Sequence, residues 1–189
     1  MITAHTKHFD SIVRRMIIPC EIAIPGEENS RQTLTALWDT GATSTCISQE
    51  VAETMGLKPE DFTPVIGMEN KTIEAPLYSI QISMGSFIIP YIQVIGLPMS
   101  SHEHNMILGM DVMVHGDVSI TNHNGKTTLS FRQPSLETID YSKEVRDIKR
   151  YTTMHMAWQK QGNQKCPCGS GKLWDNCHGN SVYLPKKAK

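Results

Sequence analysis

The sequence lacks several features that mark whole classes of protein. No apolar run approaches the about 20 residues that a membrane-spanning helix needs, so we expect no membrane span. Residues 1–8 are polar and do not resemble the apolar core of a signal peptide. The five cysteines are an odd number, and three of them cluster near the C-terminus. This usage suits a reducing compartment better than a disulfide framework, so we expect a cytoplasmic location.

Aromatic residues are scarce, at 6% of the 189 residues, yet the hydrophobic content is enough for one domain of ordinary size plus an appendage. The charges are unevenly divided. Residues 1–140 carry 8 Lys and Arg against 16 Asp and Glu, a balance of −8, whereas residues 141–189 carry 10 against 3, a balance of +7. The two parts therefore predict different partners, and the second part favours an acidic one.

The most informative stretch is Asp39-Thr40-Gly41-Ala42. It follows residues 33–38, which are apolar and β-branched and predict a buried strand that ends in a turn. In such a turn Gly41 lets the backbone approach the Asp39 carboxylate, and the Thr40 hydroxyl can lock the turn by hydrogen bonding. An aspartate that merely caps a glycine turn is the alternative interpretation.

Carboxylate chemistry sets a condition on this motif. Hydrolysis of a peptide needs two aspartates around one water: one takes the proton of the water, and the other, protonated, hydrogen-bonds the carbonyl oxygen. The chain has only one Asp-Thr-Gly, and its other candidate acids, Asp61, Asp111 and Asp117, stand in different contexts. The pattern therefore predicts a two-fold homodimer in which Asp39 faces its symmetry mate, or else a protein that is not an aspartic protease.

An apolar segment closed by glycine, Ile107-Leu108-Gly109, follows Asp39–Ala42 later in the sequence. The two motifs occur in the order and spacing of the retropepsin-like (retroviral-type) aspartic proteases, and residues 12–132 resemble that family. The resemblance implies a mainly β fold, a closed antiparallel β-barrel of the retropepsin type. It implies that Asp39 is catalytic and that catalysis needs no cofactor. The residues that would support the active-site loop are Thr40, Gly41, Ala42 and Gly109.

The resemblance also implies a flap hairpin over about residues 63–77 that closes on the substrate. The flap residues that would contact substrate are Ile66, Gly67, Met68, Glu69 and Asn70. The presumed tip, residues 68–71, lacks the glycine pair that is usual in the family. This departure favours an alternative from another class, a non-catalytic retropepsin-like peptide-binding or adaptor protein.

Periodicity predicts many short strands independently of the resemblance. They span residues 14–24, 33–38, 73–84, 86–95, 106–108, 117–121 and 127–131. Residues 49–56 predict a short helix that Ser48 begins as N-cap and Gly56 ends. Cys20 and Trp38 are expected in the core, and Cys46 is either buried or a redox-sensitive thiol. Residues 133–164 form a linker in which about residues 136–160 predict one amphipathic helix.

A second strong motif lies near the C-terminus. Cys166, Cys168, Cys177 and His178 are four ligands of the type that Zn²⁺ takes in closed tetrahedral sites. Residues 165–179 resemble the SEC-C motif, a small zinc module. Four protein ligands leave no open position on the metal, so the zinc is expected to be structural. With the basic residues 180–189 the module would dock to a protein, a ribosome or RNA.

These expectations combine into one function. The sequence predicts a homodimeric aspartic endopeptidase that hydrolyses a peptide or protein substrate in the cytoplasm and is targeted by its zinc motif. A third interpretation makes the zinc tail the main functional part and the β domain an oligomerisation platform.

Overall fold

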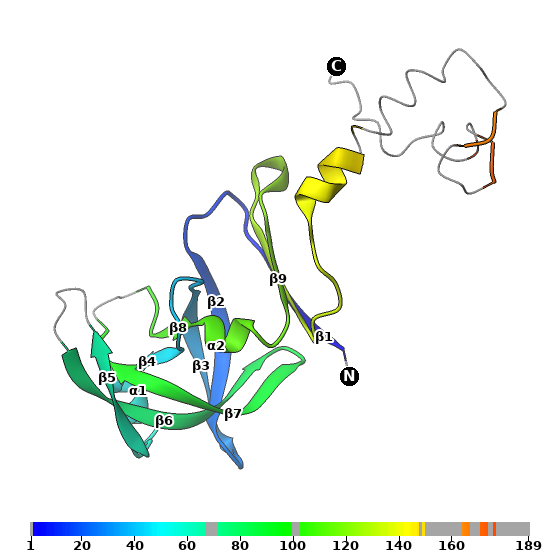
Figure 1. Ribbon diagram of the computed structural model, residues 1–189. Coiled ribbons are helices and arrows are strands. Elements are labelled where there is room, and N and C mark those ends of the chain that lie inside the picture. The colour runs from blue at the N-terminus through cyan, green and yellow to red at the C-terminus, as the bar shows by residue number, and fades with distance from the viewer. Residues whose placement is uncertain are drawn as a thin grey trace. The chain divides into compact units, whose positions relative to one another are not determined.

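The strands pair into two sheets in the computed structural model, which describes residues 2–66, 72–99, 103–147, 149, 164–166, 171–173 and 176. Among these residues, the larger sheet has the strand order β2-β3-β8-β4-β7-β6-β5 and the smaller one β1-β10-β9 (Figure 1). The strands of the larger sheet are β2 (Met16–Ile24), β3 (Glu27–Trp38), β4 (Cys46–Ser48), β5 (Asp61–Ile66), β6 (Thr72–Met84), β7 (Phe87–Leu97) and β8 (Met106–Leu108). The remaining elements are β1 (Thr3–His8), β9 (Asp117–Thr121), β10 (Thr128–Gln133), the helices α1 (Gln49–Thr54) and α2 (Met110–Met113), and the 3-10 turn η1 (His123–Gly125).

The pairings of the larger sheet return on themselves because β2 pairs with both β3 and β6. The predicted mainly β class is therefore confirmed. Most pairings are antiparallel, as predicted, but two short ones are not: β3 and β8 are parallel, and so are β4 and β7. The connection after β7 returns the chain so that β8 runs beside β3 in the same direction, with the three-residue β4 on its other side.

Glycine residues occupy the turns that join three antiparallel pairs of strands. Gly26 lies between β2 and β3 at φ 83°, and Gly85 lies between β6 and β7 at φ 63°. Asn124 and Gly125 take φ of 52° and 75° between β9 and β10. Residues other than glycine and asparagine rarely adopt such positive φ angles, so these positions fix where each hairpin reverses.

The predicted short helix is confirmed as α1. The Ser48 hydroxyl accepts a hydrogen bond from Val51 N at 3.2 Å, which caps the N-terminus. Gly56 follows the helix at φ 67°, and Leu57 N donates to Ala52 O at 2.9 Å. The helix therefore ends where the sequence placed its glycine cap.

An aromatic cluster joins the two sheets. Trp38 of β3 and Phe131 of β10 have ring centroids 5.5 Å apart, and Phe87 of β7 meets Phe131 edge to face at 4.8 Å. All three side chains are at most 2% exposed. Trp38 thus lies in the core, as predicted, and it anchors the end of β3 directly before Asp39.

The cysteines of this unit are buried in the same core. Burial raises the pKa of Cys20 to about 12. Burial, with a contribution from the nearby Asp111 carboxylate, raises the pKa of Cys46 to about 11. Both thiols are therefore protonated at neutral pH, which favours the buried interpretation of Cys46 over the redox-sensitive one.

The strand at residues 3–8 was not predicted from the sequence, and neither was the three-residue β4. Residues 3–8 form β1, which pairs antiparallel with β10 from Thr3↔Gln133 to His8↔Thr128. Polar side chains on the exposed face also link the two strands, where the hydroxyls of Thr6 and Ser130 lie within hydrogen-bonding distance, 2.8 Å apart. The strand escaped sequence analysis because β1 has little apolar content and forms one edge of a small sheet.

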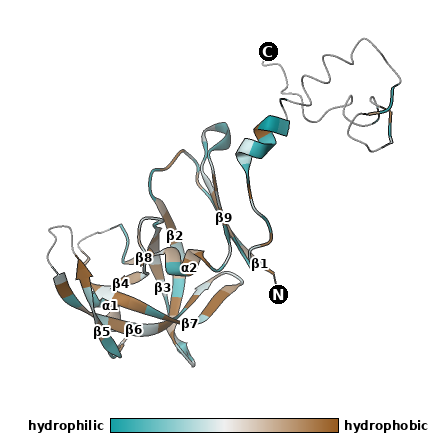
Figure 2. Ribbon diagram, viewed as in Figure 1, coloured by the Kyte–Doolittle hydropathy of each residue, from teal (hydrophilic) through white to brown (hydrophobic). Residues whose placement is uncertain are grey.

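Residues 138–189 form the second compact unit, whose described part contains a helix at residues 141–147. The predicted start at residue 136 is wrong, because Asp140 caps the helix: its Oδ1 accepts from Lys143 N at 3.0 Å. The end of the predicted helix lies outside the described residues. Figure 2 shows that this helix is mostly hydrophilic, whereas apolar residues concentrate on the strands of the larger sheet. No helix in the described part of the chain is long and apolar enough to cross a membrane.

Asp117 fastens the last segment of the first unit. Its side chain is 16% exposed, and it accepts hydrogen bonds from Arg132 Nε at 3.1 Å, from Leu136 N at 2.9 Å and from the Ser135 hydroxyl. The bond from Ser135, then those from Leu136 and Arg132, hold the pKa of Asp117 well below its usual range. Three segments of chain therefore meet on one ionised carboxylate.

We predict that Asp117→Asn lowers the melting temperature at neutral pH by several degrees. Because the pKa of Asp117 is lower in the folded state, its stabilisation is complete above the unfolded value near about 4 and is lost as pH falls through the folded value. The difference in melting temperature between parent and variant should therefore become smaller as the pH is lowered. Thermal unfolding followed by circular dichroism across that range checks this. Asp10→Asn, at a fully exposed side chain 4.0 Å from Lys126, is the control and should leave the melting temperature unchanged.

Candidate active site

The Asp39 turn begins where β3 ends beside β8. Trp38 and Leu108 are opposite each other in the parallel pairing, and Asp39 N donates to Leu108 O at 3.0 Å. Gly41 N then donates to the Asp39 carboxylate oxygen Oδ1 at 2.8 Å. Ala42 N donates to Asp39 O at 3.2 Å, which closes the turn. The side chain of Asp39 is partly exposed, with one oxygen fixed by the backbone and the other, Oδ2, without a hydrogen bond from the described residues.

The chain after Ala42 is held against the segment that follows β8. Met110 N donates to Ala42 O at 2.8 Å, and Asp111 N donates to Thr43 O at 3.3 Å. The backbones touch at Gly109, where an added Cβ would lie 2.6 Å from the carbonyl carbon of Ser44. Only glycine fits at that distance, so Gly109 sets how closely the two segments approach.

Within one copy of the chain, the hydroxyl that ties the loop to its neighbours is that of Thr45. Thr40 is exposed, and its hydroxyl has no hydrogen-bond partner among the described residues. The buried Thr45 donates through Oγ1 to Asp111 Oδ1 at 2.7 Å and accepts from Gly109 N at 3.1 Å. Thr45 N also donates to Asp111 Oδ2 at 2.7 Å. The loop that carries Asp39 is therefore tied to α2 by a carboxylate that sequence reasoning did not assign.

The sequence carries only part of a signal for this pair. Asp111 stands two residues after Gly109, at the start of α2, where its Oδ1 also accepts from Val112 N at 2.9 Å. Thr45 stands at the end of the small polar run after Asp39. These positions mark a donor and an acceptor, but nothing local in the sequence pairs them, because 66 positions separate the two residues.

The other aspartates weighed above are engaged elsewhere. Asp61 accepts from Phe62 N at 2.8 Å, Asp111 binds Thr45, and Asp117 binds Arg132. In the described ranges, none of these three stands in a turn like that of Asp39. One copy of the chain therefore presents a single aspartate in an Asp-Thr-Gly turn.

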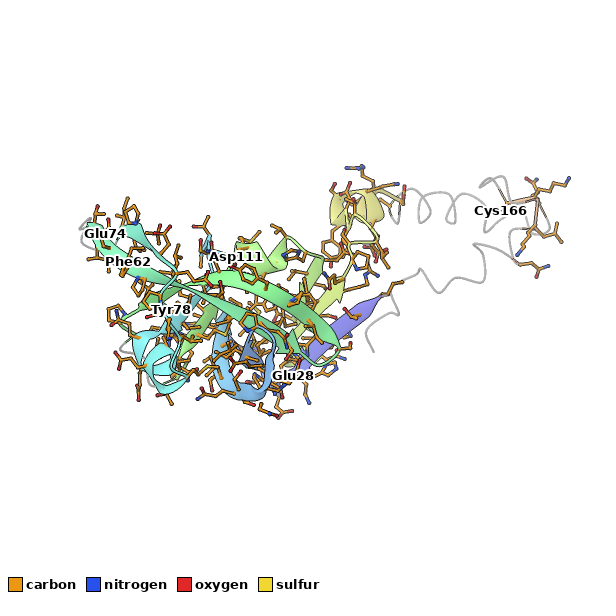
Figure 3. All side chains as sticks on the ribbon, turned by 90° about the horizontal axis from the view of Figure 1, so that it is seen from below. Glu28, Phe62, Glu74, Tyr78, Asp111 and Cys166 are labelled. Atoms are coloured by element: carbon orange, nitrogen blue, oxygen red, sulfur yellow. The ribbon has the colours of Figure 1, made fainter. Side chains whose placement is uncertain are left out.

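The predicted flap corresponds to the β5–β6 hairpin. Val65 pairs with Ile73 and Ile66 with Thr72, so the strands converge on residues 67–71. Ile66 is 72% exposed at the end of β5. Phe62 and Glu74 lie on the same hairpin, as Figure 3 shows. The other predicted contact residues, Gly67, Met68, Glu69 and Asn70, lie outside the described residues.

Of the predicted zinc ligands, the structure describes Cys166. It is 4% exposed, and its N donates to Lys172 O at 2.7 Å beside an antiparallel bridge between Lys165 and Leu173. Gly171, directly before Lys172, takes a φ of 72°, which favours glycine. The described residues contain no cluster of three metal ligands, because Cys168, Cys177 and His178 lie outside them. A donor set of three thiols and one imidazole fits Zn²⁺.

The contact at Gly109 yields a stability prediction. Gly109→Ala should lower the free energy of unfolding by about 1–3 kcal/mol, because the new methyl group overlaps the Ser44 backbone. The amides of Gly41 and Thr45 should exchange with deuterium faster than in the parent. Denaturant unfolding and hydrogen exchange by mass spectrometry check both effects.

Gly26→Ala is the matched control, since it strains a positive φ but meets nothing within 4 Å at the other end of β3. It should destabilise the fold without changing exchange in the loop. Equal exchange at Gly41 and Thr45 in the Gly109→Ala variant and the parent would contradict the proposed contact.

Comparison with known proteins bears on both motifs. The family described as "gag-polyprotein putative aspartyl protease" matches residues 24–115, and the SEC-C motif matches residues 163–180. Among solved structures, a retropepsin-like aspartic protease from Rickettsia conorii is 13% identical, covers 70% of this chain and 96% of its own, and has a TM-score of 0.46. The retroviral protease-like domain of Ddi1 from Leishmania major is 14% identical, covers 68% of this chain and 99% of its own, and has a TM-score of 0.39. The chain contains a retropepsin-like domain, and a SEC-C motif follows it.

Proposed function

We propose that the chain is an aspartic endopeptidase that acts as a homodimer. The observation that carries this proposal is the geometry around Asp39: a carboxylate at the end of a buried strand, with Oδ1 fixed by Gly41 N at 2.8 Å. The match of residues 24–115 to an aspartyl protease family supports the same reaction class. In this proposal the ring of strand pairings through β2 and β6 is the closed barrel of the retropepsin type.

Two copies of Asp39 supply the acid and the base. One carboxylate accepts a proton from a water as that water attacks the carbonyl carbon of the peptide bond. The other, protonated, donates a hydrogen bond to the carbonyl oxygen, where negative charge develops. Two carboxylates this close share one proton, so the pair holds one negative charge before the attack. Proton transfer to the leaving amine then completes the cleavage.

The dimer follows from the requirement for two aspartates. Asp61, Asp111 and Asp117 hold backbone or side-chain partners, so a second Asp39 from a second copy is the simplest source of the missing carboxylate. A two-fold axis brings identical residues together at the axis, which is where a shared site forms.

The substrate is a peptide or a protein segment in extended form. The β5–β6 hairpin supplies the flap, with Ile66 exposed at the last described position of β5. Gly67, Met68, Glu69 and Asn70 continue it in the sequence. A non-catalytic adaptor is not proposed, because the contacts that fix Asp39 are all in place in the described loop.

The C-terminal module supplies targeting. We assign Cys166, Cys168, Cys177 and His178 as ligands of one structural Zn²⁺, on the strength of the SEC-C match and the donor set. The zinc folds a segment too short for a hydrophobic core. The net charge of +7 on residues 141–189 suits an acidic partner, either a protein or RNA in the cytoplasm.

The central experiment replaces the proposed base. Asp39→Asn should reduce cleavage of a peptide library by at least about 10²–10⁴-fold, because the variant has no carboxylate to take the proton. Mass spectrometry of the library, with Asp10→Asn as control, measures this. Full activity in Asp39→Asn would end the proposal.

Activity should also depend on protein concentration. A site shared by two chains disappears when the dimer dissociates, so specific activity should fall on dilution through the dissociation range. Sedimentation velocity defines that range, and cleavage of a short peptide is measured across it. Constant specific activity in fully dissociated protein would contradict a shared site.

The zinc assignment makes a separate prediction. Full-length protein purified without chelator should contain about one zinc per chain, and Cys166→Ser should lower that content, because loss of one thiolate opens the closed site. Atomic absorption measures the metal. Cys20→Ser, at a buried cysteine of the β domain, is the matched control and should retain the zinc. Undiminished zinc in Cys166→Ser would remove Cys166 from the ligand set.

A further inference from the structure

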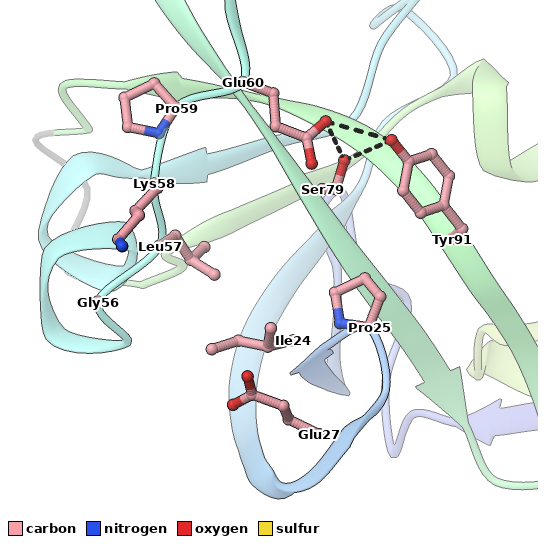
Figure 4. Close-up of a pocket in the computed structure, with 10 residues that line it drawn as sticks. All are labelled: Ile24, Pro25, Glu27, Gly56, Leu57, Lys58, Pro59, Glu60, Ser79 and Tyr91. Atoms are coloured by element: carbon pink, nitrogen blue, oxygen red, sulfur yellow. Dashed lines mark hydrogen bonds between the residues drawn. The ribbon is translucent and has the colours of Figure 1, made fainter.

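A pocket lies at the far end of β3 from Asp39. It forms between the β2–β3 turn, the loop that follows α1, and the outer face of β6 and β7 (Figure 4). Its volume is about 440 Å³, within the range of ligand sites. The twelve residues of β3 extend over about 35–40 Å, so the pocket is remote from the Asp39 turn along that strand.

A carboxylate is fixed in this pocket. The Ser79 hydroxyl donates to Glu60 Oε2 at 2.6 Å, and the Tyr91 hydroxyl lies 3.2 Å from the same oxygen and 2.7 Å from Ser79 Oγ. The three side chains come from three different segments and meet at one end of the pocket (Figure 4). Hydrogen bonds from Ser79 and then Tyr91 lower the pKa of Glu60, so it stays ionised into mildly acidic conditions.

Within the described ranges, no ion pair neutralises the negative charge of the pocket. A second carboxylate, Glu27, lines the opposite end (Figure 4). Lys58 lines the pocket too, but among the described residues no ion pair joins it to Glu27 or Glu60. The surrounding domain adds to the negative potential, with 16 acidic against 8 basic residues in residues 1–140.

The walls are suited to an aliphatic stem that carries a flat cation. Ile24, Leu57, Pro25 and Pro59 supply apolar surface. Tyr91 is 56% exposed while its hydroxyl is held, so its ring is available for stacking. A guanidinium stacks on aromatic rings and binds carboxylates through two parallel hydrogen bonds, whereas an ammonium is a point charge with stronger hydration.

We propose that this pocket binds an arginine side chain of a protein partner. The guanidinium pairs with Glu60 and lies against Tyr91, and the methylene stem covers Leu57 and Pro59. The contact goes beyond the hydrolysis assigned to Asp39 and does not depend on it. The pocket is nevertheless connected to the proposed flap hairpin. Glu60 directly precedes β5, and its N donates to Leu77 O of β6 at 2.9 Å.

The test is a titration of the full-length ¹⁵N-labelled protein, followed by NMR, with the capped peptide Ala-Arg-Ala. The expected result is saturable shifts of the Leu57, Glu60 and Tyr91 amides. The matching citrulline peptide, which keeps the shape and loses the charge, should bind at least about tenfold more weakly, because charge-assisted hydrogen bonds are the stronger ones. The Glu60→Gln variant should bind Ala-Arg-Ala more weakly than the parent by a similar factor. The Tyr91→Phe variant should show a smaller loss of binding.

Glu53→Gln is the control variant, since Glu53 is an acidic residue of α1 outside the pocket lining. It should bind the arginine peptide as the parent does. The proposal is overturned if Ala-Arg-Ala causes no shifts at millimolar concentration, if the citrulline peptide binds equally well, or if Glu60→Gln binds like the parent. The peptide comparison uses the parent protein alone, so it decides the matter even if a variant folds poorly.

Discussion

The close approach of Gly109 to the backbone of Ser44 is the contact on which the candidate active site depends. It brings two segments from distant parts of the sequence within hydrogen-bonding reach, and Thr45 and Asp111 then join them through buried or partly buried bonds. Bonds of this kind are costly to break singly, because the remaining partner stays desolvated. This junction and the parallel pairing of β3 with β8 together fix the position of the Asp39 turn. A general base needs such a support to act at a defined angle to its substrate.

Carboxylates held by neighbouring hydroxyls recur at the junctions of this fold. Thr45 donates to Asp111 beside the Asp39 loop, Ser135 donates to Asp117 where the first unit ends, and Ser79 donates to Glu60 at the base of β5. Each pair connects two segments that are at least 18 residues apart in the sequence. At Glu60, hydrogen bonds from Ser79 and Tyr91 lower the pKa of the carboxylate without a basic residue. The arginine proposed for the pocket would add, from a partner, the positive charge that the domain itself supplies sparingly.

Local signals in the sequence were sufficient for most of the strands, for the turns between them and for the main motif. Pro25-Gly26, Asn124-Gly125 and Ser48 act over a few residues, so their hairpins and helix cap could be predicted. The role of Thr45 could not be, because it depends on Asp111, 66 positions away. The parallel pairing of β3 and β8 and the strand at residues 3–8 are likewise set by distant partners. The last helix starts later than the predicted residue 136, because Asp140 provides its cap.

Mixing subunits shows whether one active site is built from two Asp39 residues. Parent and Asp39→Asn chains are combined at fixed total concentration, allowed to exchange, and assayed for peptide cleavage. If each site needs a carboxylate from both chains, activity follows the square of the parent fraction, so an equal mixture retains about a quarter of it. If each chain works alone, activity falls in proportion and about half remains. A linear dependence, in a mixture shown by mass spectrometry to have exchanged, would contradict the shared site.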